Sequence, residues 1–174
     1  MKPRSVLAAA VLVALSFVAP QRGTPQAPAA QHAGKPVSTK KFDALATRAI
    51  EAMRARAAQL GVTGVAVVSY APGDTVQGWL SKMAVVGRMK DAPSATSKGN
   101  NLIGIAYAKS AEMADTLQNS GTASRPPMTG EFGWQGGVVA QGRTGHIIVA
   151  FSGGKSEDDV QVSRAGLAVL QPAL

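Results

Sequence analysis

Hydrophobic residues recur every three or four positions over residues 41–60, and this period predicts an amphipathic helix. Ser38 or Thr39 is a suitable N-cap, and Gly61 is a suitable residue to end the helix in a left-handed conformation. A single apolar stripe of this kind is typical of core packing rather than of a cofactor site. The stripe consists of Phe42, Leu45, Ala49, Met53, Ala57 and Leu60.

The next segments predict strands. Residues 62–70 are almost all apolar or β-branched, which is typical of a central strand covered on both faces. Ala71-Pro72-Gly73-Asp74 has the composition of a turn, and residues 75–86 predict a second, less regular strand. Residues 87–101 are polar and irregular.

A second helix is predicted over residues 102–119, with Asn100 or Asn101 as its N-cap and Ser120-Gly121 at its end. A long loop that contains Pro126-Pro127 follows. Loops of this length often border ligand sites.

The C-terminal part predicts a hairpin followed by a helix. Two short strands, 138–140 and 146–151, flank a turn with glycines at 142 and 145. Ser152-Gly153-Gly154 then interrupts the second strand. Ser156 is in the position of a helix N-cap, with Asp159 three residues on as a variant capping box. Acidic residues in this first turn complement the helix dipole, namely Glu157, Asp158 and Asp159.

The order is therefore helix, two strands, helix, two strands, helix. Hairpins imply antiparallel pairing, and each helix has an apolar stripe to bury against the sheet. The sequence predicts an α/β (α+β) fold, a three-layer domain with a mainly antiparallel central sheet flanked by helices.

The N-terminus predicts an export signal. Two basic residues precede an uncharged run that ends at residue 19, shorter than a membrane span. We expect a signal peptide over 1–19 with cleavage between 19 and 30, a flexible Pro/Ala-rich linker over 20–37, and one domain over 38–174. An uncleaved anchor is the alternative. The expected location is periplasmic or secreted, with no membrane span after cleavage, and His32 is expected to be a solvated linker residue.

Charge and composition restrict the classes of partner that we expect the protein to bind. The net charge is +8, but the basic residues are dispersed and aromatic residues make up only 5%. This pattern favours an anionic ligand or surface over a nucleic acid. Cysteine is absent, which excludes disulfides and thiol chemistry. No complete catalytic or phosphate-binding motif is present, so we expect no catalytic residue.

His146 is the only histidine of the predicted domain. If the strand alternates, His146, Ile148 and Ala150 share one face. One hypothesis makes His146 an axial haem-iron ligand, and therefore the metal ligand of the site. The alternative is a structural histidine that forms a hydrogen bond to a backbone group.

Ser152, Gly153 and Gly154 precede a helix, where unpaired backbone N–H groups can bind an anion. The acidic side chains of that first turn argue against an anion, and the glycines alternatively serve only the turn. Other candidates lie in the irregular segments, each with a solvated or packing role as the alternative. Basic candidates for an acidic ligand are Arg88, Lys98 and Arg125, and candidates for an apolar pocket or a soft iron ligand are Met83, Met89 and Met128.

Two stretches carry a family resemblance. The segment from the SGG at residues 152–154 to RAGLAVL at 164–170, and the opening ALATRAIEAMRARAAQLGVTGVAVVSY, resemble the GlcG/HbpS-like family of haem-binding or haem-degrading proteins, to which the PduO C-terminal domain is related. The resemblance covers about residues 42–170. The middle departs from it, because VVGRMKDAPSATSKG keeps Arg88-Met89 and Ala92 but has Lys90-Asp91 where the family pattern has Asp-Gly.

The resemblance implies the same three-layer fold, a homo-oligomer and a haem ligand. The leading hypothesis is an exported small-molecule-binding protein that binds haem or a related tetrapyrrole for sensing, storage or scavenging. The alternatives are an enzyme that degrades haem or acts on a small organic acid, and a ligand-free oligomeric interaction module. The predicted cofactor-binding residues are His146, Ser152, Gly153, Gly154, Arg88 and Met89.

Overall fold

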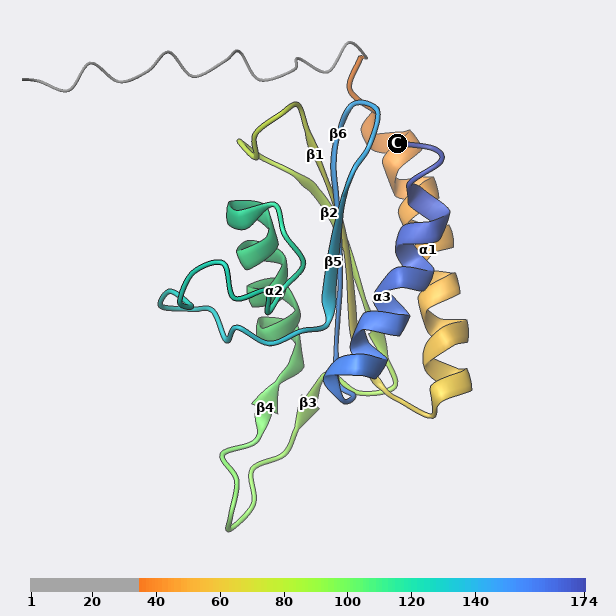
Figure 1. Ribbon diagram of the computed structural model, residues 1–174. Helices are drawn as coiled ribbons and strands as arrows, with labels where there is room; N and C mark the ends of the chain where they lie inside the picture. The colour runs from red at the N-terminus through yellow and green to blue at the C-terminus, as the bar shows by residue number, and fades with distance from the viewer. Residues whose placement is uncertain (1–34) are drawn as a thin grey trace, which may run out of the picture.

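The computed structural model describes residues 35–174 (Figure 1). The predicted signal peptide, its cleavage site, most of the predicted linker and His32 lie outside these residues. The elements in chain order are α1 Thr39–Leu60, β1 Gly64–Pro72, β2 Leu80–Val86, β3 Lys90–Asp91, β4 Asn100–Asn101, α2 Leu102–Thr116, β5 Gly137–Gln141, β6 Gly145–Ser152 and α3 Ser156–Leu170.

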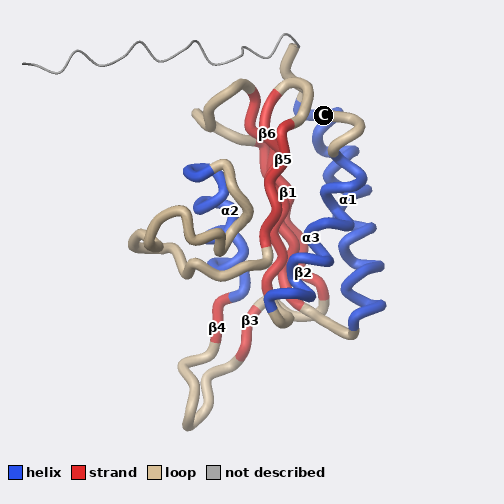
Figure 2. The backbone as a smooth tube through the Cα atoms, in the orientation of Figure 1, coloured by secondary structure: helices blue, strands red, loops and turns tan. Residues whose placement is uncertain are grey.

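Four strands form one antiparallel sheet in the order β2-β1-β6-β5. Helices α1 and α3 cover one face of this sheet and α2 covers the other (Figures 1 and 2). The short strands β3 and β4 pair separately and project from the end of the domain. The predicted three-layer α/β fold is confirmed.

Alternation along β6 divides its side chains between two cores. Ile147, Val149 and Phe151 pack with α1 and α3, whereas Ile148 and Ala150 pack with α2. Strand β1 alternates in the same way, and both strands are buried on both faces, as a central pair must be. Within residues 35–174, no helix has the length and apolar character needed to span a membrane.

Helix α1 follows its sequence signals closely. Ser38 is the N-cap and its Oγ accepts a hydrogen bond from the Lys41 N–H, while Gly61 ends the helix with a φ of 66°. The helix begins two residues before the predicted start at residue 41.

The predicted strand 75–86 is wrong over its first half, because β2 begins only at Leu80. Continuing the β1–β2 register would place Pro72 opposite Gly78. Pro72 has no N–H to donate and glycine is a poor strand residue, so the ladder ends here.

The predicted helix 102–119 is too long by three residues. Helix α2 ends at Thr116, and Leu117 adopts a φ of 52°. The next side chains bind strand β5 instead: Asn119 Oδ1 accepts from the Val139 N–H, and Ser120 Oγ accepts from the Gly137 N–H. These hydrogen bonds redirect the chain away from the helix axis.

The predicted capping box of the last helix is also wrong. Lys155 occupies the N-cap position without a side-chain hydrogen bond, and Ser156 is the first helical residue. The side chain of Asp159 turns into the protein, where it meets a lysine from α2.

Candidate functional site

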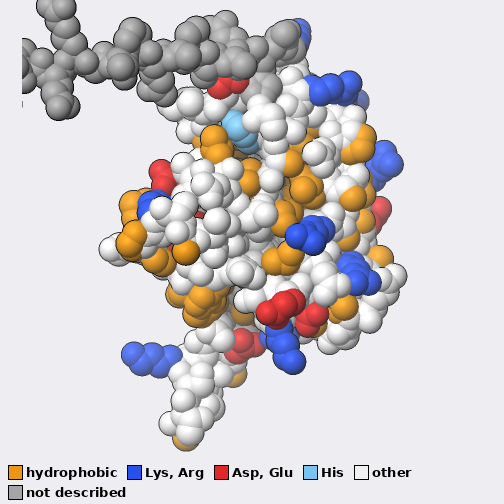
Figure 3. All heavy atoms as spheres, in the orientation of Figure 1, with side chains coloured by type: hydrophobic (Ala, Val, Ile, Leu, Met, Phe, Trp, Pro, Cys, Tyr) orange, Lys and Arg blue, Asp and Glu red, His pale blue; other side chains and the backbone are white. Residues whose placement is uncertain are grey.

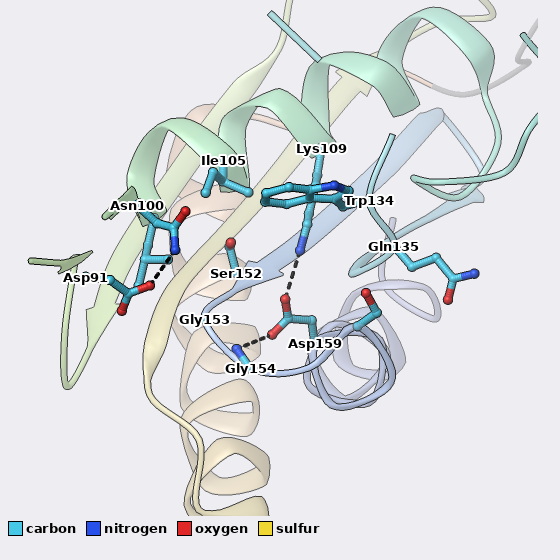
Figure 4. A pocket seen from close by; sticks show the side chains of 12 residues that line it. Asp91, Asn100, Ile105, Lys109, Trp134, Gln135, Ser152, Gly153, Gly154 and Asp159 are labelled. Atoms are coloured by element: carbon cyan, nitrogen blue, oxygen red, sulfur yellow. Dashed lines mark hydrogen bonds and ion pairs between the residues drawn. The ribbon is translucent and has the colours of Figure 1, made fainter. Parts of the chain in front are cut away.

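A polar cavity of about 120 Å³ lies where β6 ends, between α2 and the start of α3 (Figure 4). Its apolar walls are Leu102, Ile105 and Trp134. Its main polar walls come from three different elements and are Lys109 of α2, Ser152 of β6 and Asp159 of α3.

Lys109 and Asp159 form a buried ion pair in this cavity. Lys109 Nζ lies 2.8 Å from Asp159 Oδ2 and donates to the Phe151 carbonyl at 2.9 Å. Their side chains are 3% and 4% exposed. Burial lowers the pKa of Lys109 and raises the pKa of Asp159, and the attraction within the pair opposes both shifts.

The ion pair depends on a glycine. Gly136 has a φ of 135°, and a Cβ at this position would lie 2.2 Å from Lys109 Nζ. The Gly136 carbonyl accepts hydrogen bonds from the Phe151 N–H at 3.1 Å and from Ser163 Oγ at 2.6 Å. Close packing of backbone against a lysine head group therefore requires Gly136.

The predicted anion cradle is filled by the protein itself. The Gly154 N–H donates to Asp159 Oδ1 at 2.8 Å. Hydrogen bonds from the N–H groups of Gly153 and Gly154 act to lower the pKa of Asp159, against the larger effect of burial. Ser152 is buried, and its hydroxyl makes no hydrogen bond within residues 35–174. In Figure 4 this hydroxyl points toward α2 and the cavity. Ser152, Gly153 and Gly154 all line the cavity, and their role as a haem-binding segment stays a prediction.

Arg88 lies beside this segment. Its guanidinium donates to the carbonyls of Thr63 and Gly153, both at 2.6 Å, and to Asp91 Oδ1 at 2.8 Å. Hydrogen bonds from Asn100 and Arg88 hold the pKa of Asp91 below its usual value. Through these hydrogen bonds, Arg88 links the segment after β2 to the turn at Gly153-Gly154 that follows β6.

His146 lies far from the cavity. It is the second residue of β6, and Ser152 ends the strand six residues later, which corresponds to about 20 Å along a strand. His146 is buried and its Nε2 lies 3.0 Å from the Asp74 carbonyl. The structure therefore separates His146 from Arg88 and from Ser152–Gly154.

The three basic candidates do not come together either. Arg125 binds Asp115 and forms a paired contact with Glu131, with distances of 2.7–2.8 Å to the two Glu131 oxygens. The Arg125 hydrogen bonds lower the pKa of Glu131 to about 2. Lys98 lies on the exposed β3–β4 hairpin. Over the visible face, lysine and arginine side chains are scattered rather than gathered (Figure 3).

A pair of exposed aromatic side chains borders the cavity, and the sequence patterns did not single it out. Phe132 and Trp134 have ring centroids 4.8 Å apart and are 46% and 48% exposed. Trp134 is a wall of the polar cavity, and Phe132 lines a neighbouring hollow of about 360 Å³ together with Ile105 and Asn100. The feature of the sequence that could have identified this pair is the presence of two aromatic residues within the glycine-rich stretch 130–137.

A third hollow, of about 340 Å³, lies along the β3–β4 hairpin. It is lined by Met89, which is 48% exposed, by Ile103, and by the basic residues Lys90 and Lys98. Asn100 lines all three hollows, so they are neighbours at the base of the hairpin. Within residues 35–174, no three His, Asp or Glu side chains cluster as a metal site would require.

No family model matches the sequence, and a comparison with curated proteins gives no match. Solved structures do match. The Klebsiella pneumoniae protein ORFY, of the family DUF336, is 16% identical with a TM-score of 0.50, over 82% of this chain and 97% of that chain. PduOC, crystallised as a haem complex, is 17% identical with a TM-score of 0.51, over 78% and 96%.

A double mutant of HbpS from Streptomyces reticuli also matches, at 20% identity and a TM-score of 0.47, over 94% of this chain and 98% of that chain. At such identities the likeness concerns the arrangement of helices and strands. The resemblance expected from the sequence is confirmed at that level: this chain has a fold similar to those of the DUF336 protein ORFY and of PduOC.

Proposed function

We propose that the protein binds haem or a related tetrapyrrole on the surface around Phe132 and Trp134. The observation that carries the proposal is this aromatic pair, whose rings are in contact at a tilt of 32° and half exposed beside two neighbouring hollows. Large aromatic side chains are costly to leave in water, and a flat conjugated ligand would bury both rings by stacking.

The two hollows of about 340 and 360 Å³ that Asn100 lines offer apolar contacts and positive charge to such a ligand. Ile103 and Ile105 supply apolar contacts, and Lys90 and Lys98 supply positive charge for the propionates. Met89 offers a half-exposed thioether as a soft iron ligand. The similar fold of PduOC, which was crystallised with haem, supports the same ligand class.

The test is a titration of the purified protein with hemin, followed by Soret absorbance and by quenching of tryptophan fluorescence. We expect saturable binding in the wild type and at least tenfold weaker binding after Trp134→Ala, which corresponds to about 1.4 kcal/mol. Trp79→Ala is the matched control, since Trp79 lines a different groove, with Leu117 and Thr75.

A His146→Ala variant separates the two possible iron ligands. Retained affinity and an unchanged Soret band, together with a changed band after Met89→Ala, would support the hairpin site. The proposal is contradicted if hemin gives no saturable response, or if Trp79→Ala weakens binding and Trp134→Ala does not.

We also propose that the protein is exported and acts outside the cytoplasm as a homo-oligomer. The basic start and uncharged run of residues 1–19 support export. The mass of the protein recovered from the periplasm or medium should correspond to cleavage between residues 19 and 30, and light scattering should give more than one chain per particle. A full-length mass and a monomer would each contradict the corresponding part.

A further inference from the structure

We infer that the polar cavity is a separate site for a small neutral aldehyde or ketone, which forms an imine with Lys109. This site goes beyond tetrapyrrole binding and rests on different atoms, although Trp134 borders both surfaces.

Two polar groups in the cavity have bonding capacity left over. A lysine ammonium has three N–H groups, and Lys109 Nζ has two acceptors, the Phe151 carbonyl and Asp159 Oδ2. Ser152 is 4% exposed as a residue, and its hydroxyl points into the cavity, makes no hydrogen bond within residues 35–174 and is accessible from the cavity (Figure 4). Since it has no partner in the described part of the chain, this hydroxyl is free to donate to an acceptor in the cavity, such as a carbonyl oxygen.

The pair Lys109–Asp159 also supplies the proton transfers that imine formation needs. Asp159 Oδ2 lies 2.8 Å from Lys109 Nζ and is placed to accept the ammonium proton when a carbonyl ligand is bound, and burial, which lowers the pKa of Lys109 and raises that of Asp159, makes this transfer easier. The free amine adds to the carbonyl carbon to give a carbinolamine. The carbinolamine hydroxyl leaves as water with the proton from Asp159, so that one lysine ammonium and one carbonyl give one protonated imine, paired with the Asp159 carboxylate, and one water. A desolvated lysine is the usual amine in such chemistry.

Size and charge restrict the ligand. At about 120 Å³, the cavity is smaller than the two neighbouring hollows, which favours a small ligand. Asp159 and Asp91 both line the cavity, and Glu112 adds negative charge near Lys109, so a carboxylate ligand is disfavoured. Leu102, Ile105 and Trp134 supply the apolar part of the walls, which suits a short alkyl chain.

The test is reductive trapping on the full chain. The protein is incubated at pH 7 with acetaldehyde and sodium cyanoborohydride, and ethylated lysines are located by peptide mass spectrometry. A lysine side chain in water, whose pKa is about 10.4, holds very little free amine at this pH. We expect Lys109 to be ethylated at least about tenfold faster than Lys82.

Lys82 is the matched control, because it also pairs with an aspartate, Asp43, at 2.7 Å, but is 34% exposed and lines no part of the cavity. Ser152→Ala should slow the labelling of Lys109 and leave that of Lys82 unchanged. Pyridoxal phosphate, a larger and anionic aldehyde that the acidic lining disfavours, should label exposed lysines and spare Lys109. The inference is overturned if labelling follows exposure and Lys109 stays unmodified, which would leave the ion pair a purely structural link between α2 and α3.

Discussion

Lys109 extends from α2 into the protein and ends among acceptors from two other elements, the Phe151 carbonyl of β6 and the Asp159 carboxylate of α3. Removing a charge from water is expensive, and each partner is tolerated only because the other is present. The contact ties the helices on opposite faces of the sheet to one another around the end of β6.

Replacing Lys109 by Met should lower the free energy of unfolding by about 3–5 kcal/mol, because Asp159 would be left buried without its cation. Urea denaturation measures the loss. Lys82→Met is the control, since it breaks a partly exposed pair and should cost about 0–1 kcal/mol. A double variant with Lys109→Met and Asp159→Leu should recover part of the loss. Equal effects of the two single Met variants would show that burial of the pair carries no special cost.

The hydrophobic pattern of the sequence indicates this ion pair, although the pair was not predicted. Leu102, Ile105, Ala106 and Met113 mark the buried stripe of α2, and Lys109 falls on that stripe at the seventh position after Leu102. Asp159 likewise begins the buried series of α3 that continues with Val162 and Gly166. A charge within an apolar stripe indicates a buried partner, but the spacing does not identify that partner.

At the scale of elements, the loop from Leu117 to Gly136 is ordered by charge rather than by a core. Arg125 binds Asp115 at the end of α2 and Glu131 across the loop, and Glu131 also accepts the Met128 N–H at 2.8 Å. The loop in turn places Phe132 and Trp134 beside the cavity. Its order should therefore depend on the ionisation of Glu131.

Acid should loosen this loop. The pKa of Glu131 is lowered to about 2 in the folded protein from an ordinary value of 4.5. Its stabilising contribution is therefore complete above about pH 4.5 and is lost as the pH falls toward 2. In a Trp79→Phe background, Trp134 fluorescence should stay constant between pH 7 and 5 and change between about 4.5 and 2.

Glu131→Gln is the control for that titration. It removes the charge and should give the loosened fluorescence already at pH 7, with far-UV circular dichroism unchanged. A titration curve that is the same in this variant and in its parent would mean that another group orders the loop.

Local sequence predicted the elements where local hydrogen bonds decide their ends. Ser38 and Gly61 bound α1 as expected, and Asn101 caps α2 through its Oδ1. The predictions failed where a distant partner intervenes. Strand β5 ends α2 early by binding Asn119 and Ser120, and Lys109 turns Asp159 away from its expected capping role.

At the scale of the whole molecule, three layers are held at close distance by small residues. Helices α1 and α3 pack side by side on one face of the sheet. At their contact, a Cβ on Gly166 would lie 2.8 Å from Met53 Sδ and 3.1 Å from Val149 Cγ1. Gly166 thus sets the distance between α3, α1 and the centre of the sheet.

Gly166→Leu should lower the free energy of unfolding by at least about 1–3 kcal/mol, because the added side chain overpacks this contact. The loss should appear even though leucine favours a helix more than glycine does. Ala168→Leu on the exposed side of α3 is the matched control and should change stability by about 0.5 kcal/mol or less. A stabilised Gly166→Leu protein would show that the layers can separate without cost.

The sequence by itself determined the three layers, because apolar periods of 3.6 and 2 residues must each bury a face and the hairpins fix antiparallel pairing. Only the tertiary structure decided the site. Contacts between Lys109 and Asp159, or between Arg88 and Gly153, join residues 50 or more positions apart, and a periodic pattern carries no information on such distances. The same strand that brings Ser152 to the cavity holds His146 at its other end, because an extended strand of eight residues keeps its two ends apart.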